Sequence, residues 1–229
     1  MSKSLGNVLH PNDIVSKYGT DPVRYYLLKE IPTFSDGDFS HHRMQEIYNS
    51  DLANNLGNLV SRTLSMLEKY NQGRTPPQPA TNIAGENRDH IDQAIQKLAL
   101  EVIRSDPESS DYDLCFKQRR VSDAINLIWH KIDLANQFIN ATEPWKLSKD
   151  EKNNQRLLEV LYWLTQMIHI ITWELYPFLP NTALKIADGF NINKLLQEDR
   201  NRHHAVHEWK EEVPTKSIPP LFPKREDNP

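Results

Sequence analysis

Four side chains in the sequence belong to types that bind phosphates or nucleic-acid bases. Lys3 lies between two serines near the N-terminus, where a mobile ammonium can act as a point charge on a phosphate. Asn58 and Arg62 are four residues apart, so on a helix they point the same way. A splayed-out RNA base needs an aromatic platform and polar groups directed at its edge. Trp145 and the Asn58–Arg62 pair are therefore candidates for base recognition.

Each candidate also has a structural interpretation. Residues 1–4 can be a solvated polar N-terminus. Asn58 and Arg62 can cap a helix or face solvent, and Trp145 can be a hydrophobic plug between helices. Residue type and spacing alone favour these structural interpretations, so the choice depends on the surrounding sequence.

Metal binding is not expected. His41–His42 and the group His203–His207 have no cysteines nearby, and adjacent histidines in polar surroundings are usually solvated. The single cysteine, Cys115, excludes an internal disulfide and a cysteine-rich zinc site. It also favours a reducing compartment.

The composition predicts a helical cytosolic protein. Only seven glycines occur among 229 residues, and neither GxGxxG nor a Walker loop is present, which argues against a βαβ nucleotide fold in this chain. The formal net charge of −4 provides no global positive field for nucleic acid. No apolar run reaches the ~20 residues that cross a bilayer, and the N-terminus lacks the apolar core of a secretory signal.

The segment 11–31 predicts two short helices. Asn12 or Asp13 is expected to cap the first helix, and Thr20 the second. The expected inner face of the second helix consists of Val23, Tyr26 and Leu27.

Longer helices are predicted from spacings of three and four between apolar residues. They cover about thirty residues from Ser40, then 89–104, 121–139 and 157–175, with a short helix over 181–188. The proline-containing stretch 71–88 is expected to be an exposed loop or linker. These long helices, without a convincing alternating strand, predict an all-α antiparallel helix bundle. The polar, proline-rich end, 191–229, is expected to be a docking tail or a frayed terminus.

Two N-terminal segments resemble class I aminoacyl-tRNA synthetases. Met1-Ser2-Lys3-Ser4-Leu5-Gly6-Asn7-Val8 is similar to the KMSKS signature and its continuation, from the second position of the motif onward. The first lysine would precede Met1, so the chain is expected to begin inside the motif. Residues 18–28, YGTDPVRYYLL, resemble the stem-contact element that joins the catalytic domain to a helical bundle.

The segments that follow resemble methionyl-tRNA synthetases in particular. They are Glu30-Ile31-Pro32, residues 36–40, residues 48–62 and Glu143-Pro144-Trp145-Lys146-Leu147, in which Glu143 replaces the usual alanine. This resemblance covers about residues 1–190.

The resemblance implies a role for each candidate. Met1, Ser2, Lys3 and Ser4 would form the ATP-binding loop, with Lys3 as the catalytic lysine that stabilises charge on the phosphates. Asn58 and Arg62 would contact the first anticodon base, and Trp145 would stack on an anticodon base. The bound RNA would be tRNA(Met) with its CAU anticodon.

The resemblance also implies a division of the chain. Residues 1–39 would hold the KMSKS loop and stem-contact segment, 40–190 the α-helical anticodon-binding bundle, and 191–229 the tail. This part would need no cofactor, whereas the full enzyme would use ATP and magnesium to form methionyl-adenylate and transfer methionine to tRNA. Any zinc would lie in the missing part. The partners would be tRNA(Met) and the missing catalytic domain, without a membrane, and the oligomeric state stays open.

Without its nucleotide fold the chain alone should be inactive. The alternative is a free-standing, catalytically inactive tRNA- or RNA-binding or assembly protein with the same helical fold.

Overall fold

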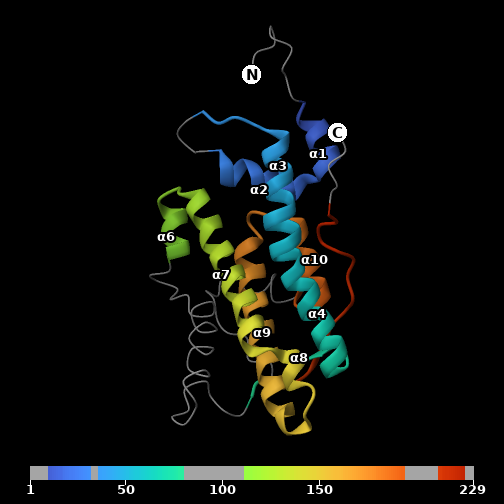
Figure 1. The fold of residues 1–229 in the computed structure, drawn as a ribbon. Helices are drawn as coiled ribbons and strands as arrows, with labels where there is room; N and C mark the ends of the chain where they lie inside the picture. Colours follow the sequence, from blue (N-terminus) through green and yellow to red (C-terminus); the bar gives the residue numbers. More distant parts are fainter. Residues whose placement is uncertain (1–9, 32–35, 80–110, 194–210, 225–229) are drawn as a thin grey trace.

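Helices account for most of the structure. The computed structural model describes residues 10–31, 36–79, 111–193 and 211–224. The predicted helix 89–104 and the KMSKS-like loop lie outside these residues. Within them the chain forms a helical bundle with one two-stranded sheet, which confirms the all-α prediction (Figure 1). None of the described helices is long and apolar enough to span a membrane.

Two short helices, α1 (Pro11–Tyr18) and α2 (Thr20–Glu30), lie across one end of the bundle. The predicted caps are wrong, because each helix begins one or more residues earlier. His10 is the N-cap of α1, since Pro11 is preorganised for the first helical position. Gly19, with φ of +91°, is the N-cap of α2.

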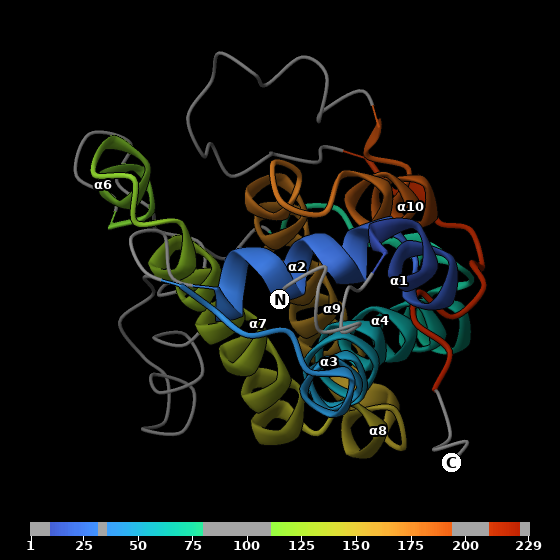
Figure 2. The same ribbon diagram turned by 90° about the horizontal axis from the view of Figure 1, so that it is seen from above.

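The predicted inner face of α2 is partly wrong. Val23 and Tyr26 are buried, but Leu27 is 47% exposed and Tyr25 is fully buried instead. The reason is that α2 contacts several helices, so its buried positions do not form one stripe (Figure 2). Tyr25 stacks on Trp129 of α7, with ring centroids 4.2 Å apart.

The third predicted helix consists of three consecutive helical segments. They are α3 (His41–Ile47), the π-helix η2 (Tyr48–Gly57) and α4 (Asn58–Asn71). Ser40 caps α3, because the backbone N–H of Arg43 donates to its Oγ at 3.4 Å. The residues whose spacings of three and four predict a helix here are fully buried, as expected of one apolar stripe: Leu52, Leu56, Leu59, Thr63 and Leu67. The widened π turn was not predicted, because spacings of three and four do not distinguish it from an α-helix.

The centre of the bundle is formed by two 22-residue helices, α7 (Val121–Thr142) and α9 (Asn154–Leu175). They are antiparallel, since the short α8 (Pro144–Leu147) and a 3-10 turn (Glu151–Asn153) join them. In both helices the apolar residues whose spacings of three and four predict the helix are buried, apart from partly exposed Val121 at the first position. The short α6 (Asp111–Lys117) precedes α7, and α10 (Pro180–Phe190) covers the predicted 181–188.

Residues 211–224, here called the C-terminal segment, lie along α4 and α10. A strand pair, β1 (Arg74–Thr75) and β2 (Val213–Pro214), attaches this segment to the end of α4. The N–H of Lys216 donates to the carbonyl oxygen of Gly189 at 2.7 Å. Phe222 is buried edge-on against Tyr48. These strands were not expected, because two residues are too few for an alternating pattern to show.

Candidate nucleic-acid interface

A polar seam runs between η2–α4 and α7. The Asn55 amide donates to Asp133 Oδ1 at 2.7 Å, and Asn136 Nδ2 donates to Asn55 Oδ1 at 2.8 Å. Further along, Arg62 Nη2 donates to Asn140 Oδ1 at 3.4 Å. The three α7 residues are spaced by three and four, so they share one face of that helix. The seam therefore fixes the rotation of η2 and α4 against α7.

Asn58 and Arg62 lie beside this seam with polar groups still available. Asn58 is the exposed first residue of α4, and its side-chain amide makes no hydrogen bond to a described residue. The Arg62 guanidinium has five N–H donors, of which one is used by Asn140. Asn140 therefore orients the guanidinium while leaving donors for another acceptor.

Trp145 lies where α7 turns into α8. Glu143 ends α7 with a φ of +44°, and Pro144 occupies the first position of α8. The Glu143 carboxylate pairs with Lys146 at 2.8 Å across this turn. The Trp145 side chain is 38% exposed. More than a third of its surface is therefore open to a binding partner.

The other end of the seam is closed by a charged cluster. Lys29 Nζ lies 2.5 Å from Asp51 Oδ2, and the Tyr25 hydroxyl donates to the same oxygen at 2.8 Å. Burial raises the pKa of the Asp51 carboxyl, but hydrogen bonds from Lys29, Ser50 and Tyr25 bring the pKa below its ordinary value. Burial, with Asp51 alongside, raises the pKa of the Tyr25 hydroxyl far above its ordinary value, so the tyrosine stays a donor. The cluster joins α2 to η2.

A second attachment holds α2 to the opposite side of the bundle. Asp21 Oδ2 accepts from the backbone N–H of Thr182 at 2.6 Å and from its hydroxyl at 2.7 Å. Arg24 donates to the carbonyl oxygens of Phe178 at 2.9 Å and Pro177 at 3.1 Å. Both residues belong to the YGTDPVRYYLL segment, so its charged side chains bind the first turn of α10 and the turn that precedes it. Sequence reasoning missed this role, because the partners are more than 150 residues away.

The remaining predicted site residues are not tested by these contacts. Met1, Ser2, Lys3 and Ser4 lie outside the described residues, as does the group His203–His207. The described part of the chain holds no group of three or more histidine, cysteine, aspartate or glutamate side chains that could bind a metal ion.

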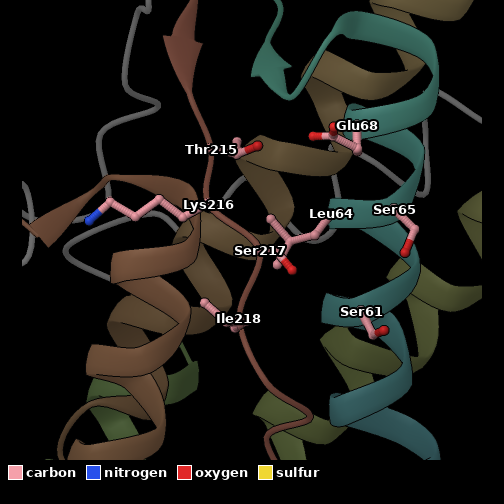
Figure 3. Close-up of a pocket in the computed structure, with 8 residues that line it drawn as sticks. All are labelled: Ser61, Leu64, Ser65, Glu68, Thr215, Lys216, Ser217 and Ile218. Atoms are coloured by element: carbon pink, nitrogen blue, oxygen red, sulfur yellow. The ribbon is translucent and has the colours of Figure 1, made fainter.

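A cavity of about 470 Å³ lies between α4 and the C-terminal segment (Figure 3). Its polar lining includes Ser61, Ser65 and Glu68 from α4, facing Thr215 and Ser217. None of the predicted base-recognition residues lines it. The cavity is therefore separate from the predicted base-recognition residues.

Comparison with known proteins agrees with this architecture. The family model for class I tRNA synthetases (M) matches residues 1–64. A methionine–tRNA ligase of Clostridium acetobutylicum is 44% identical over 192 residues, which is 84% of this chain and 28% of that protein. The corresponding ligase of Fusobacterium nucleatum is 36% identical over 229 residues, which is 99% of this chain and 34% of that protein. The chain belongs to the methionyl-tRNA synthetase family.

The structural comparison leads to the same family. Mycobacterium tuberculosis methionyl-tRNA synthetase in complex with methionyl-adenylate superimposes with a TM-score of 0.79 at 30% identity. The match covers 97% of this chain and 41% of that chain. The chain thus spans about a third of the length of the methionyl-tRNA synthetases it matches, and the family resemblance seen in the sequence is confirmed. The alternative of a free-standing inactive relative is not favoured.

Proposed function

We propose that this chain is the anticodon-binding part of a methionine–tRNA ligase and recognises the CAU anticodon of tRNA(Met). The observation that carries the proposal is the exposed Trp145 just beyond the end of α7, the helix whose Asn140 holds Arg62, while Asn58 and Arg62 keep unused polar groups. A platform and edge-directed groups on one face are what a splayed-out base requires.

Each side chain has a distinct role in this proposal. Trp145 stacks on an anticodon base through its exposed indole. The Asn58 amide can both donate and accept, and the Arg62 guanidinium only donates. Together they suit the edge of the first base, cytosine, which offers an amino group and acceptors. Because the seam holds Arg62 at Asn140, the RNA does not have to order it completely.

The catalytic part of the proposal concerns the whole enzyme. That enzyme would form methionyl-adenylate from methionine and ATP with magnesium, then transfer methionine to the tRNA. Lys3, within the loop Met1–Ser4, would stabilise charge on the departing pyrophosphate. The rest of the ATP site would come from the catalytic domain that this chain does not span, so we expect no ATP–pyrophosphate exchange by the chain alone. The setting would be the cytoplasm.

The direct test is RNA binding by the 229-residue chain. An anticodon stem-loop with CAU should bind more tightly than one whose first anticodon base is changed, both measured at the same salt concentration. Equal affinity for the two loops would contradict anticodon recognition by this bundle.

A further inference from the structure

The π-helix η2 extends over ten consecutive residues immediately before α4. A π-helix, with hydrogen bonds from i to i+5, is rare and usually lasts a single turn. A segment of this length therefore needs contacts from outside the helix to keep it in the π form. The Asp51 cluster and the Asn55 amide supply two such contacts, both of them polar.

An apolar contact to η2 comes from the other end of the chain. The C-terminal segment runs back along α4 from Thr215, which bonds to Gly73 at the end of that helix (Figure 1). The buried Phe222 ring lies edge-on to Tyr48, the first residue of η2, with ring centroids 6.0 Å apart. A Cβ placed on Gly57, the last residue of η2, would lie 3.7 Å from Phe222 Cδ2. One ring therefore packs against both ends of the π-helix.

Gly57 suits the π form of this segment. A Cβ at this position would lie only 3.0 Å from the carbonyl oxygen of Leu52, five residues earlier. The i to i+5 pattern brings that carbonyl close to residue 57, so glycine avoids a contact that alanine would make. In an α-helix the same replacement would instead stabilise the helix. A substitution at Gly57 therefore distinguishes the π form of η2 from the α form.

Phe222 is an apolar anchor for the end of the C-terminal segment. Nearer its start, the backbone N–H groups of Thr215 and Lys216 donate hydrogen bonds to the rest of the bundle, each at 2.7 Å. Residues 219–224 make no hydrogen bond to a described residue, and the three prolines among them have no N–H to donate. Burial of Phe222, next to half-buried Leu221, therefore keeps this end of the segment on η2.

The form of η2 decides where Asn58 points. Asn58 is the first residue of α4 and follows Gly57 directly. A π turn contains more residues than an α turn, so a change of η2 toward the α form would rotate the start of α4 about its axis. Arg62, one turn further along, is held by Asn140, whereas the Asn58 amide bonds to no described residue. Its direction therefore depends on the helix that precedes it.

We propose that Phe222 is a positioning residue for base recognition: by holding η2 in the π form, it directs the Asn58 amide toward the first anticodon base. Phe222 is buried, so it acts through η2 without touching the RNA. This inference rests on the proposed anticodon recognition. If Phe222 were only a packing residue, its loss would lower stability without changing the preference for one base over another.

The test compares two dissociation constants for each variant of the 229-residue chain, well below its melting temperature. The discrimination ratio is the Kd of a stem-loop with its first anticodon base changed, divided by the Kd of the CAU stem-loop. Phe222→Ala should lower this ratio about threefold or more, as expected when a base-edge contact is partly lost. The control is Ile218→Ala in the same segment, because Ile218 packs beside Gly189 of α10. It should lower the melting temperature and keep the ratio.

Three further variants test the route through η2. In an Asn58→Ala background, Phe222→Ala should lower the ratio no further, since the group that it positions is absent. Phe222→Leu refills part of the apolar volume and should recover part of the ratio. Gly57→Ala should lower the ratio although alanine is the better α-helix former, and it leaves Phe222 in place.

Hydrogen exchange gives a measurement that does not depend on RNA. The backbone amides of residues 48–57 should exchange faster in Phe222→Ala than in the parent, because η2 loses its apolar contact. In Ile218→Ala the same amides should exchange as in the parent. Equal protection of η2 in the parent and in Phe222→Ala would contradict the proposal.

The outcomes separate this inference from the proposed function. If the parent prefers the CAU loop and Phe222→Ala keeps the parent's ratio, Phe222 is not a positioning residue, and anticodon recognition still stands. The inference also fails if Phe222→Ala lowers the ratio equally with and without Asn58. If the parent binds both loops equally, the proposed function and this inference are both overturned.

Discussion

The Asp21 carboxylate in α2 caps α10 by accepting from both the backbone N–H and the hydroxyl of Thr182, at 2.6 and 2.7 Å. Thr182 is the third residue of α10, where a helix has N–H groups without partners inside the helix. Asp21 is only 4% exposed. A residue of the segment that precedes the bundle thus completes a helix near the other end of the chain.

Asp21→Ala should destabilise the chain by about 1–3 kcal/mol, since it leaves buried donors on Thr182 without their acceptor. Urea unfolding followed by circular dichroism measures this free energy. Asp13→Ala, at an exposed position in the first turn of α1, is the matched control and should cost less than about 0.5 kcal/mol. A double-mutant cycle with Thr182→Ala should show coupling of roughly 0.5–3 kcal/mol. If the stability costs of the two single substitutions simply add in the double variant, the contact between Asp21 and Thr182 contributes little to stability.

Trp145→Ala should weaken binding of a CAU stem-loop by roughly tenfold to a hundredfold, because stacking contributes about 1–3 kcal/mol per base. Its melting temperature should stay close to that of the parent, since the side chain is exposed. Trp129→Ala is the contrasting variant. Trp129 is buried against Tyr25, so its removal should cost about 3–5 kcal/mol of stability. A large drop in melting temperature for Trp145→Ala, without a separate binding defect, would make it a packing residue.

Asn58→Ala and Arg62→Ala should each narrow the difference in affinity between CAU and a loop with its first base changed. The reason is that contacts to base edges distinguish one base from another, whereas phosphate contacts do not. A good bidentate contact between a side chain and a base contributes about 1–3 kcal/mol of this discrimination. Ser65→Ala, an exposed position one turn further along the same helix that lines the cavity of about 470 Å³, is the control. If both variants keep the discrimination of the parent, these residues do not recognise the base.

Asp51, which joins η2 to α2 through Lys29 and Tyr25, should make the free energy of unfolding depend on pH. Its folded-state pKa lies below the value of about 3.9 for an unfolded aspartate. As the pH falls, Asp51 is therefore protonated at a higher pH in the unfolded state than in the folded state. The free energy of unfolding that this pKa shift contributes is fully present above about pH 4. It is lost as the pH falls through the lower folded-state pKa. The difference in unfolding free energy between the parent and Asp51→Asn should thus be larger at pH 7 than at pH 3. A difference that does not change with pH would contradict this linkage.

The sequence determined the helices because their signals are local. The apolar residues of α7 and α9 recur every three or four positions, and that periodicity alone indicates which face is buried. Asn58 and Arg62 share a side of α4 for the same reason, since their spacing of four matches the helical repeat. The segments that identified the family are also contiguous, so no tertiary structure was needed to find them.

Only the tertiary structure decided which residues meet across the bundle. Tyr25 rather than Leu27 is buried because α2 lies against α7 and α10, and no pattern within α2 contains that information. The exposure of Trp145 depends on the turn at Glu143, and the orientation of Arg62 depends on Asn140, 78 residues away. The Asp21–Thr182 contact spans 161 residues. Such contacts depend on how whole helices pack, because the free energy that fixes them comes from the buried core and not from the pair itself.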